Sequence, residues 1–527
     1  MTTDRGRSLQ MRVVTERRSR APYLPRRTVF LDYTTGRALN EEGRGGQLPA
    51  AADVGDLLDR IPEWVQRICV VGAPPQGWSA WGLQLPVDHP RWAASRKGHY
   101  LPSGDWPALR FAARDIDREV EIRGAGEWFT GVDSVDTARD AWELLKVAVG
   151  RVAPEAIPLS SPGVTGQQIA QWLLPKNKQF LVLSADLRNE IARTSMQGGD
   201  QLLLPPSGRK MLGGFSVHDG RVMYGGMLRE LGSAAPTGPA LLSEEYGTPM
   251  PWLDLDLQKG DTPSRFHPGR IKVSATVPAD WSHLSIFKLP NPDREASARY
   301  LYPREPGETF TVWCDPVEAE CAYRAGWDVR VRARILYPQR DGRPLDTFAK
   351  RMEEQSKLIE ADRDGVGPEL ARLVSRALRL CVVRLVGTLA SRSVRVTRTG
   401  ALGDLPPGIM EWDTLPTGEV VWTEEVASPA GTWTHPEWAS AIWARARIRA
   451  LDGPCPGDRA RRIGALHVPA EHVVGVHADA VYLDHDPEWP DDGAWGRLRR
   501  QGKVLGRRKW PTSSRELAEL VREATGG

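Results

Sequence analysis

The sequence is poor in cysteine and has no long hydrophobic run. Its five cysteines are widely spread, no two of them have the C-x-x-C spacing of a metal site, and their odd number argues against a disulfide framework. No apolar run approaches the roughly 18 residues of a membrane-spanning helix. The first 20 residues are polar and rich in arginine, without the apolar core of a secretory signal. We therefore expect a cytoplasmic protein with reduced, buried thiols and no membrane partner.

The net charge is small, and lysine is rare among the basic residues. Lys and Arg number 70 against 67 Asp and Glu, a net charge of +3, which excludes a histone-like chain and a strongly acidic one but leaves room for local basic grooves. Only about 12 of the 70 basic residues are lysine. The arginine excess reflects either a GC-rich genome or a preference for the planar guanidinium group, which binds phosphate better than an ammonium group does.

The length and the apolar pattern predict several α/β units. At about 150 residues per domain, 527 residues correspond to three or four units. A content of 41% apolar residues and a mean hydropathy of −0.40 indicate a globular chain that can bury several cores. Helical spacing of apolar residues predicts helices at 134–150, 164–174, 185–195, 316–325, 345–361, 367–390, 438–451 and from 513 onward. Strands are predicted at 27–36, 63–74, 210–219, 270–277, 308–313 and 327–336, with a hairpin at 471–484.

Two acidic residues each end an apolar strand. Asp219 follows Phe215-Ser-Val-His, and Asp479 lies at the tip of the predicted hairpin. Carboxylates from different strands that meet at one sheet edge can hold divalent ions, and two such ions can stabilise the attacking and leaving oxygens of a phosphoryl transfer. The alternative is that both acids are solvated turn residues.

The order and the flanks of these segments resemble family B DNA polymerases. Asp219-Gly-Arg-Val-Met-Tyr224 resembles their first palm motif, Asp-x-x-Ser-Leu-Tyr-Pro. Residues 473–482 are similar to their third motif, in which Asp-Thr-Asp-Ser joins two strands. Between them, the segment from Arg379 to Gly387 lies where the fingers motif, Lys-x-x-x-Asn-Ser-x-Tyr-Gly, is expected.

Further segments follow the family's order along the chain. Gly198 and Gly199 resemble the end of the Tyr-x-Gly-Gly linker of the protein-primed branch, and residues 436–445 resemble the helix before the third motif. Asp32-Tyr-Thr-Thr-Gly36 resembles the first exonuclease motif, Asp-x-Glu-Thr-Gly. No single motif is a full match, so the specificity of the resemblance lies in the ordered set, which runs through most of the chain.

The resemblance implies a multidomain α/β and α+β fold. An RNase H-like, exonuclease-like N-terminal domain would be followed by the palm, fingers and small thumb of a right-hand polymerase. The implied parts are a disordered basic leader (1–25), a degenerate 3'-5' exonuclease-like domain (26–160), the first part of the palm with an insertion (161–335), the fingers (336–395), the second part of the palm (396–490) and a thumb-like segment (491–527).

The resemblance also implies a role for each matched residue. Asp219 and Asp479 would be the catalytic carboxylates that bind two Mg2+ or Mn2+ ions. Tyr224 would be the steric gate, whose ring lies beneath the sugar of the incoming dNTP and rejects a 2′-hydroxyl. Arg379 replaces the fingers lysine that contacts the triphosphate, and Val383 occupies the position of the nucleotide-binding asparagine.

Several family positions carry a different type of residue. Val383 and Val386 replace the asparagine and tyrosine that pack on the nascent base pair, and His477 replaces the first aspartate of the third motif. In the exonuclease motif Asp32 is kept, but Thr34 stands where a glutamate is expected, and no convincing second exonuclease motif is found. We therefore expect proofreading to be lost.

A glycine pair and a basic segment are expected to contact DNA. Glycines would let the backbone approach the template closely, and the basic residues, with Trp510 beside them, lie where the family's thumb-side lysine approaches the primer terminus and would contact DNA there. The alternatives are a simple turn and a solvated basic face. The residues concerned are Gly198, Gly199, Lys503, Arg507 and Lys509.

The first hypothesis is thus a DNA-directed DNA polymerase that extends a DNA primer or a protein primer and uses dNTPs and two divalent ions. Its partners would be primer-template DNA or single-stranded ends, with a terminal protein as a further candidate, and its location the nucleoid. The second hypothesis is a catalytically reduced homologue that acts as a DNA-binding, architectural replication factor. The third is an unrelated α/β protein with accidental motif matches.

Overall fold

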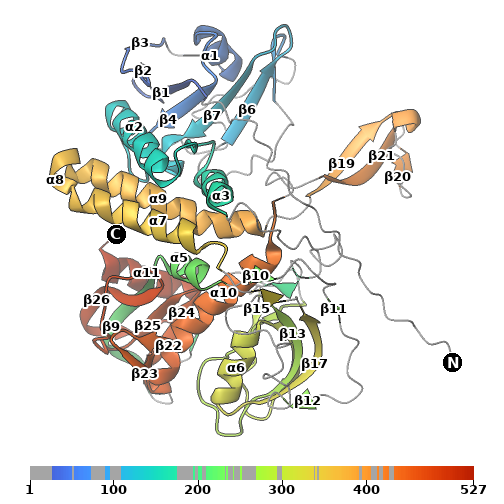
Figure 1. Ribbon diagram of the computed structural model, residues 1–527, viewed down its shortest axis with the longest axis vertical. Coiled ribbons are helices and arrows are strands. Elements are labelled where there is room, and N and C mark those ends of the chain that lie inside the picture. Colours follow the sequence, from blue (N-terminus) through green and yellow to red (C-terminus); the bar gives the residue numbers. More distant parts are fainter. Residues whose placement is uncertain are drawn as a thin grey trace. The chain divides into compact units, whose positions relative to one another are not determined.

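The chain forms two compact units in the computed structural model. The first unit comprises residues 174–349 and 434–527, and the second comprises 19–173 and 350–433 (Figure 1). The expected leader at 1–25 and most of the helix expected at 185–195 lie outside the described residues. The structure describes residues 26–49, 51, 53–72, 89–94, 108–174, 191, 194–195, 200–203, 209–231, 233–234, 241–242, 250–251, 269–292, 300–336, 339–340, 343–390, 394–404, 412–414, 419–426 and 433–526.

The first unit contains a five-stranded antiparallel sheet with the strand order β26-β9-β25-β24-β8. β9 and β26 form the longest pairing of this sheet, with ten residue pairs from Arg497↔Arg221 to Lys509↔Met211. The segment expected to form a thumb therefore supplies an edge strand to the sheet that carries Asp219. The strands are β8 (Asp200–Leu202), β9 (Met211–Arg221), β24 (Val473–His477), β25 (Ala480–Leu483) and β26 (Arg497–Lys509).

An apolar cluster supports this sheet. Phe215 of β9 stacks on Tyr482 of β25, with ring centroids 6.1 Å apart, and both pack with Trp510 and Leu517. Leu517 belongs to helix α11 (Ser514–Thr525), which begins after Ser513, because the Ser513 hydroxyl accepts the backbone N–H of Glu516. Phe215 of β9 is thus packed by Leu517, which follows it by 302 positions in the chain.

A second sheet of the first unit has the order β11-β17-β13-β16, with β12 also paired to β17. Helix α6 (Pro316–Arg324) begins with a capping box between Asp315 and Glu318. Helix α10 (Pro436–Leu451) is buried almost throughout. The other elements of this unit are α5 (Met223–Glu230), β10 (Ser233–Ala234), β11 (Leu241–Leu242), β12 (Met250–Pro251), β13 (Arg270–Thr276), β14 (Leu289–Pro290), β15 (Tyr300–Leu301), β16 (Thr309–Cys314), β17 (Asp328–Leu336), β18 (Gln339–Arg340), β22 (Gly453–Cys455), β23 (Asp458–Ile463), η5 (Ala465–His467) and η6 (Ala470–His472).

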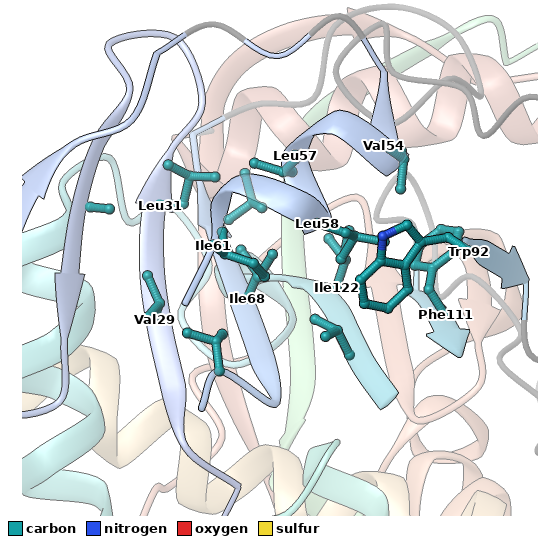
Figure 2. Packing of buried hydrophobic residues seen from close by; sticks show 14 residues of the cluster. Val29, Leu31, Val54, Leu57, Leu58, Ile61, Ile68, Trp92, Phe111 and Ile122 are labelled. Atoms are coloured by element: carbon teal, nitrogen blue, oxygen red, sulfur yellow. The ribbon is translucent and has the colours of Figure 1, made fainter. Parts of the chain in front are cut away.

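The second unit contains a seven-stranded sheet with the order β3-β2-β1-β4-β7-β6-β5. β1, β4 and β7 are parallel to one another, and the outer strands are antiparallel to their neighbours. Side chains such as Leu31, Ile68 and Ile122 from the three parallel strands pack against Leu58 of α1 and against Trp92 (Figure 2). The elements are β1 (Thr28–Asp32), β2 (Arg37–Asn40), β3 (Gly45–Gln47), α1 (Val54–Arg60), β4 (Arg67–Val71), β5 (Trp92–Ala94), β6 (Ala108–Ala113), β7 (Glu119–Gly124) and η2 (Ala125–Glu127).

Helices α3 (Pro162–Leu173) and α9 (Pro368–Leu389) of the second unit pack closely together. A Cβ atom built on Gly166 of α3 would lie only 2.2 Å from the carbonyl oxygen of Cys381 in α9, so the approach requires glycine. The remaining elements of this unit are α2 (Val135–Val152), most of α7 (Asp346–Ala361), α8 (Arg363–Val366), β19 (Val394–Gly400), η4 (Leu402–Asp404), β20 (Trp412–Thr414) and β21 (Val420–Val426).

A buried carboxylate in the second unit is surrounded by arginines. Glu121 of β7 is fully buried and forms ion pairs with Arg26, Arg67 and Arg123 at 2.7–3.1 Å. Burial alone would raise its pKa, but the guanidinium groups outweigh burial and lower the pKa of Glu121 to about 2. The carboxylate is therefore ionised and paired at neutral pH.

The secondary structure agrees with most of the sequence-based predictions. The helices expected at 134–150, 316–325, 345–361 and 438–451 correspond to α2, α6, α7 and α10, and the expected hairpin corresponds to β24 and β25. All five cysteines are buried and free, as expected. Among the described residues, no helix combines the length and the apolar character that crossing a bilayer requires.

Candidate active site

Asp219 and Asp479 lie beside each other at one end of β9 and β25, two neighbouring inner strands of the five-stranded sheet. Asp219 is near the end of β9, and Asp479 is in the turn that joins β24 to β25. β25 pairs with β9 so that Val481 is opposite His218, and continuing this register places Asp479 opposite Gly220. A Cβ atom on Gly220 would lie 2.6 Å from the Oδ2 atom of Asp479. Glycine at this position therefore makes room for the second carboxylate.

The backbone next to both acids is unusual. Ala478 has φ +52° and Val222 has φ +43°, two of the three non-glycine residues with positive φ in the part of the chain that the structure describes. A β-branched residue such as valine rarely adopts this conformation, because its side chain crowds the neighbouring carbonyl oxygen. Such strain persists where the surrounding structure fixes it, and it is common at functional sites.

Each of the two carboxylates disfavours ionisation of the other. Burial, followed by the negative charge of Asp219, raises the pKa of Asp479 to about 7. Burial also raises the pKa of Asp219, and the guanidinium group of Arg499 on β26 opposes that shift. Two buried, mutually repelling carboxylates gain much by binding a cation. Their hard oxygen donors fit Mg2+ or Mn2+.

Tyr224 is the third predicted residue at this edge. It lies in the first turn of α5, two residues after the strained Val222. Burial and the charges of Asp479 and Asp219 raise the pKa of its phenol, so the hydroxyl is neutral at physiological pH. The packing behind it is tight, since a Cβ atom on Gly225 would lie 2.4 Å from the Trp495 ring. Glycine at position 225 therefore lets the backbone of α5 approach Trp495.

A small hollow opens next to Ala478, the residue before Asp479, and two cations that the sequence did not reveal lie in its wall. Lys288 is 4% exposed, and its Nζ atom lies 4.8 Å from the centre of the Tyr300 ring. Arg447 of α10 is 8% exposed and donates to the Ile286 carbonyl and to Glu318. The hollow is lined by Tyr224, Lys288, Trp443, Ala446, Arg447 and Ala478. Cations in the wall of the hollow, close to the sequence neighbour of Asp479, suit a ligand that carries phosphates.

Comparisons by sequence find no relative: no family model matches, and no curated protein matches. Solved structures do match. The complex of phi29 DNA polymerase with primer-template DNA and incoming nucleotide substrates aligns with a TM-score of 0.56 at 12% identity, covering 92% of this chain and 86% of that chain. The complex of phi29 DNA polymerase with single-stranded DNA aligns with a TM-score of 0.52 at 13% identity, covering 92% and 85%.

This chain has the fold of phi29 DNA polymerase. At 12–13% identity the likeness concerns the fold alone, a mixed α/β multidomain architecture.

Within the phi29 polymerase fold, the predicted fingers residues belong to the second unit. Arg379 lies on α9 and forms an ion pair with Glu360 of α7. Val383 is half-buried and Val386 is fully buried on the same helix. The role of Arg379 in contacting a triphosphate remains a prediction.

The predicted DNA-binding residues have different outcomes. Gly198 and Gly199 lie outside the described residues. Lys503 and Arg507 are exposed on β26, and Lys509 pairs with Glu516 of α11 at 3.2 Å. Trp510, beside these residues in the sequence, is buried: it is 1% exposed and its Nε1–H donates to the Leu203 carbonyl at 2.9 Å.

Asp32, the retained residue of the exonuclease motif, stabilises its own turn. Its Oδ1 atom accepts the backbone N–H of Thr34 at 2.9 Å, and its Oδ2 atom accepts the Thr35 hydroxyl at 2.7 Å. The turn ends at Gly36, which has φ +74°. A carboxylate held in this way has a structural role that needs no metal ion.

Proposed function

We propose that the protein is a DNA-directed DNA polymerase of the family B type that adds dNTPs to a primer with the help of two divalent ions. The observation that carries the proposal is the pair Asp219 and Asp479, buried beside each other at one sheet edge and beside Gly220, in a chain with the phi29 polymerase fold.

In the proposed reaction, the primer 3'-hydroxyl attacks the α-phosphate of the dNTP in line, and pyrophosphate leaves. Divalent ions held by Asp219 and Asp479 would reduce the charge that develops on the attacking and leaving oxygens. The phenol ring of Tyr224 would lie under the deoxyribose and exclude a 2′-hydroxyl. Lys288 and Arg447 would attract the phosphates from the opposite wall of the hollow. Arg379 would contact the β- and γ-phosphates, as the sequence resemblance implies.

We further propose that proofreading is lost. The strand order of the seven-stranded sheet, with parallel β1, β4 and β7 beside antiparallel β2 and β3, supports an RNase H-like origin for the N-terminal domain. However, Thr34 lacks the negative charge that a glutamate would bring to a metal ion, and Asp32 accepts hydrogen bonds within its own turn. The domain would then serve as a wall for single-stranded template. A primer with a mismatched 3'-end should be retained intact by the enzyme when dNTPs are omitted.

Primer extension tests the main proposal. Purified protein with Mg2+ or Mn2+, primed template and labelled dNTPs should extend the primer, and Asp219→Asn and Asp479→Asn should each abolish extension. Asp280→Asn, an exposed carboxylate of the same unit, is the matched control and should extend normally. Adding a terminal-protein candidate with a free hydroxyl in place of the primer tests protein priming. No incorporation with either metal ion by the unaltered protein refutes the enzyme.

The second candidate is a DNA-binding factor without catalysis. It is favoured by His477 in place of an aspartate, by Val383 and Val386 in place of polar nucleotide contacts, and by the ion pair that Arg379 makes with Glu360. This candidate predicts DNA binding that is unchanged by Asp219→Asn and Asp479→Asn, with no incorporation in any of the three proteins.

A further inference from the structure

The open end of the β24–β25 hairpin carries two histidines and an aspartate that the proposed polymerase site does not use. The Nδ1 atoms of His472 and His485 each lie 2.9 Å from the same oxygen, Oδ1 of Asp484. One donor atom from each of the three residues lies within 4.8 Å of the other two. The three side chains therefore converge on one point.

The backbone fixes the three residues relative to one another. The N–H of Asp484 donates to the carbonyl of His472 at 3.0 Å, directly across the end of the hairpin. The carbonyl of His485 accepts the hydroxyl of Ser216 on β9 at 2.6 Å. A ligand set supported by paired strands is more rigid than one supported by a loop, and rigid ligands lose little entropy on binding an ion.

The carboxylate of the cluster is buried, whereas the two imidazole rings are partly exposed to solvent. The Asp484 side chain is 2% exposed, whereas the side chains of His472 and His485 are 38% and 44% exposed. Arg209 donates to Oδ2 of Asp484, which leaves Oδ1 facing the two imidazole rings. The carboxylate is thus oriented from behind, while the histidine side of the cluster is open to solvent.

We propose that His472, Asp484 and His485 bind a first-row transition metal ion, with zinc as the best fit. Two imidazole nitrogens and one carboxylate oxygen suit Zn2+, whereas Mg2+ and Ca2+ prefer oxygen ligands throughout. Ligands about 2.0–2.1 Å from a tetrahedral zinc ion lie about 3.3 Å from one another. The separations of 2.9 Å to 4.8 Å bracket this value, so small rotations of the side chains admit the ion.

The ion would have a structural role. Asp484 and Asp479 lie at opposite ends of β25, five residues apart, which at about 3.3 Å per residue is roughly 16 Å. The site is therefore too far from the polymerase carboxylates to take part in phosphoryl transfer. It would tie β24 to β25 at the end opposite the Asp479 turn. Water from the exposed side would complete the coordination.

Titration of tag-free, EDTA-treated and dialysed full-length protein with ZnCl2 tests the proposal. Millimolar Mg2+ is kept present to occupy oxygen-ligand sites. One equivalent of Zn2+ should bind and raise the melting temperature. His472→Gln and His485→Gln should each weaken binding at least about 100-fold, because loss of an outer-shell partner alone costs about 10–100-fold. His467→Gln, whose imidazole pairs with Asp452 outside the cluster, is the matched control.

A second measurement uses the unaltered protein, so its result does not depend on whether a variant folds. Co2+ bound to the unaltered protein should give visible absorption bands, and Zn2+ should displace them. The proposal is overturned if the unaltered protein binds no stoichiometric Zn2+, or if His472→Gln, His485→Gln and His467→Gln bind it equally well. These readouts do not involve nucleotide incorporation. They therefore succeed or fail independently of the polymerase proposal.

Discussion

Gly220 offers a direct test of the geometry of the two carboxylates. In Gly220→Ala, the added methyl group would lie 2.6 Å from Oδ2 of Asp479 and 2.6 Å from Cβ of Met223. Heavy atoms that are not bonded prefer separations of about 3.5–4.0 Å, so about 1 Å must be gained on each side. A 1 Å displacement of a catalytic group costs about 10²-fold in rate. Overpacking of this kind costs about 1–3 kcal/mol in stability.

The assay is single-turnover addition of one dNTP to a primed template at saturating Mg2+, accompanied by thermal melting of the same samples. Gly213→Ala is the control, because Gly213 lies on the same strand and a Cβ atom there meets nothing within 4 Å. We expect Gly220→Ala to add nucleotide about 100-fold more slowly than Gly213→Ala. Equal rates in the two variants would refute the reasoning. Should the unaltered protein add no nucleotide, Mn2+ affinity of the same variants tests the same displacement.

Three further predictions concern stability. Because the pKa of Asp479 is raised to about 7, the folded, metal-free protein holds a proton that the unfolded chain releases above about pH 4. The melting temperature should therefore fall as the pH rises from 5 to 8. In Asp479→Asn, which cannot release this proton, the melting temperature should depend less on pH over the same range. Gly166→Ala should destabilise the protein by about 1–3 kcal/mol in urea titrations, whereas Gly150→Ala, in α2 with open space around it, should be neutral or stabilising by up to about 1 kcal/mol. Glu121→Gln should cost about 3–5 kcal/mol at pH 7. Since the pKa of Glu121 is lowered to about 2, its contribution to the free energy of unfolding should be lost as the pH falls from 4.5 to 2. The stability of Glu121→Gln should not show this loss over the same pH range.

The two carboxylates could be predicted from the sequence because they obey local rules. Each follows an apolar run, and an antiparallel hairpin must place its tip at the end of a neighbouring strand. The long helices were equally predictable, since the apolar spacing of α2 and α9 and the Ser134 cap are local signals. These features need no knowledge of distant partners.

The cations of the hollow could not be predicted in this way. Arg447 is buried because of contacts with segments far along the chain, such as Glu318, which lies 129 positions before it. The burial of Trp510 could not be predicted for the same reason, because its hydrogen-bond partner Leu203 lies 307 positions away. The local signal for Arg447 is the set of arginines within the largely apolar helix α10. Arginines on a buried helix indicate charges that pair with residues elsewhere in the chain.

The pairing of β9 with β25 and β26 has a consequence for biosynthesis. Both neighbours of β9 come late, since Ala480 follows Arg221 by 259 positions and Lys509 is later still. During synthesis on the ribosome, both edges of β9 therefore stay unpaired until β25 and β26 have been translated. Three of the five strands of the sheet follow β9 in the chain. Closing such distant pairings is slow, and unpaired strand edges attract other chains. The pairing that places Asp479 beside Asp219 can form only after β25 has emerged.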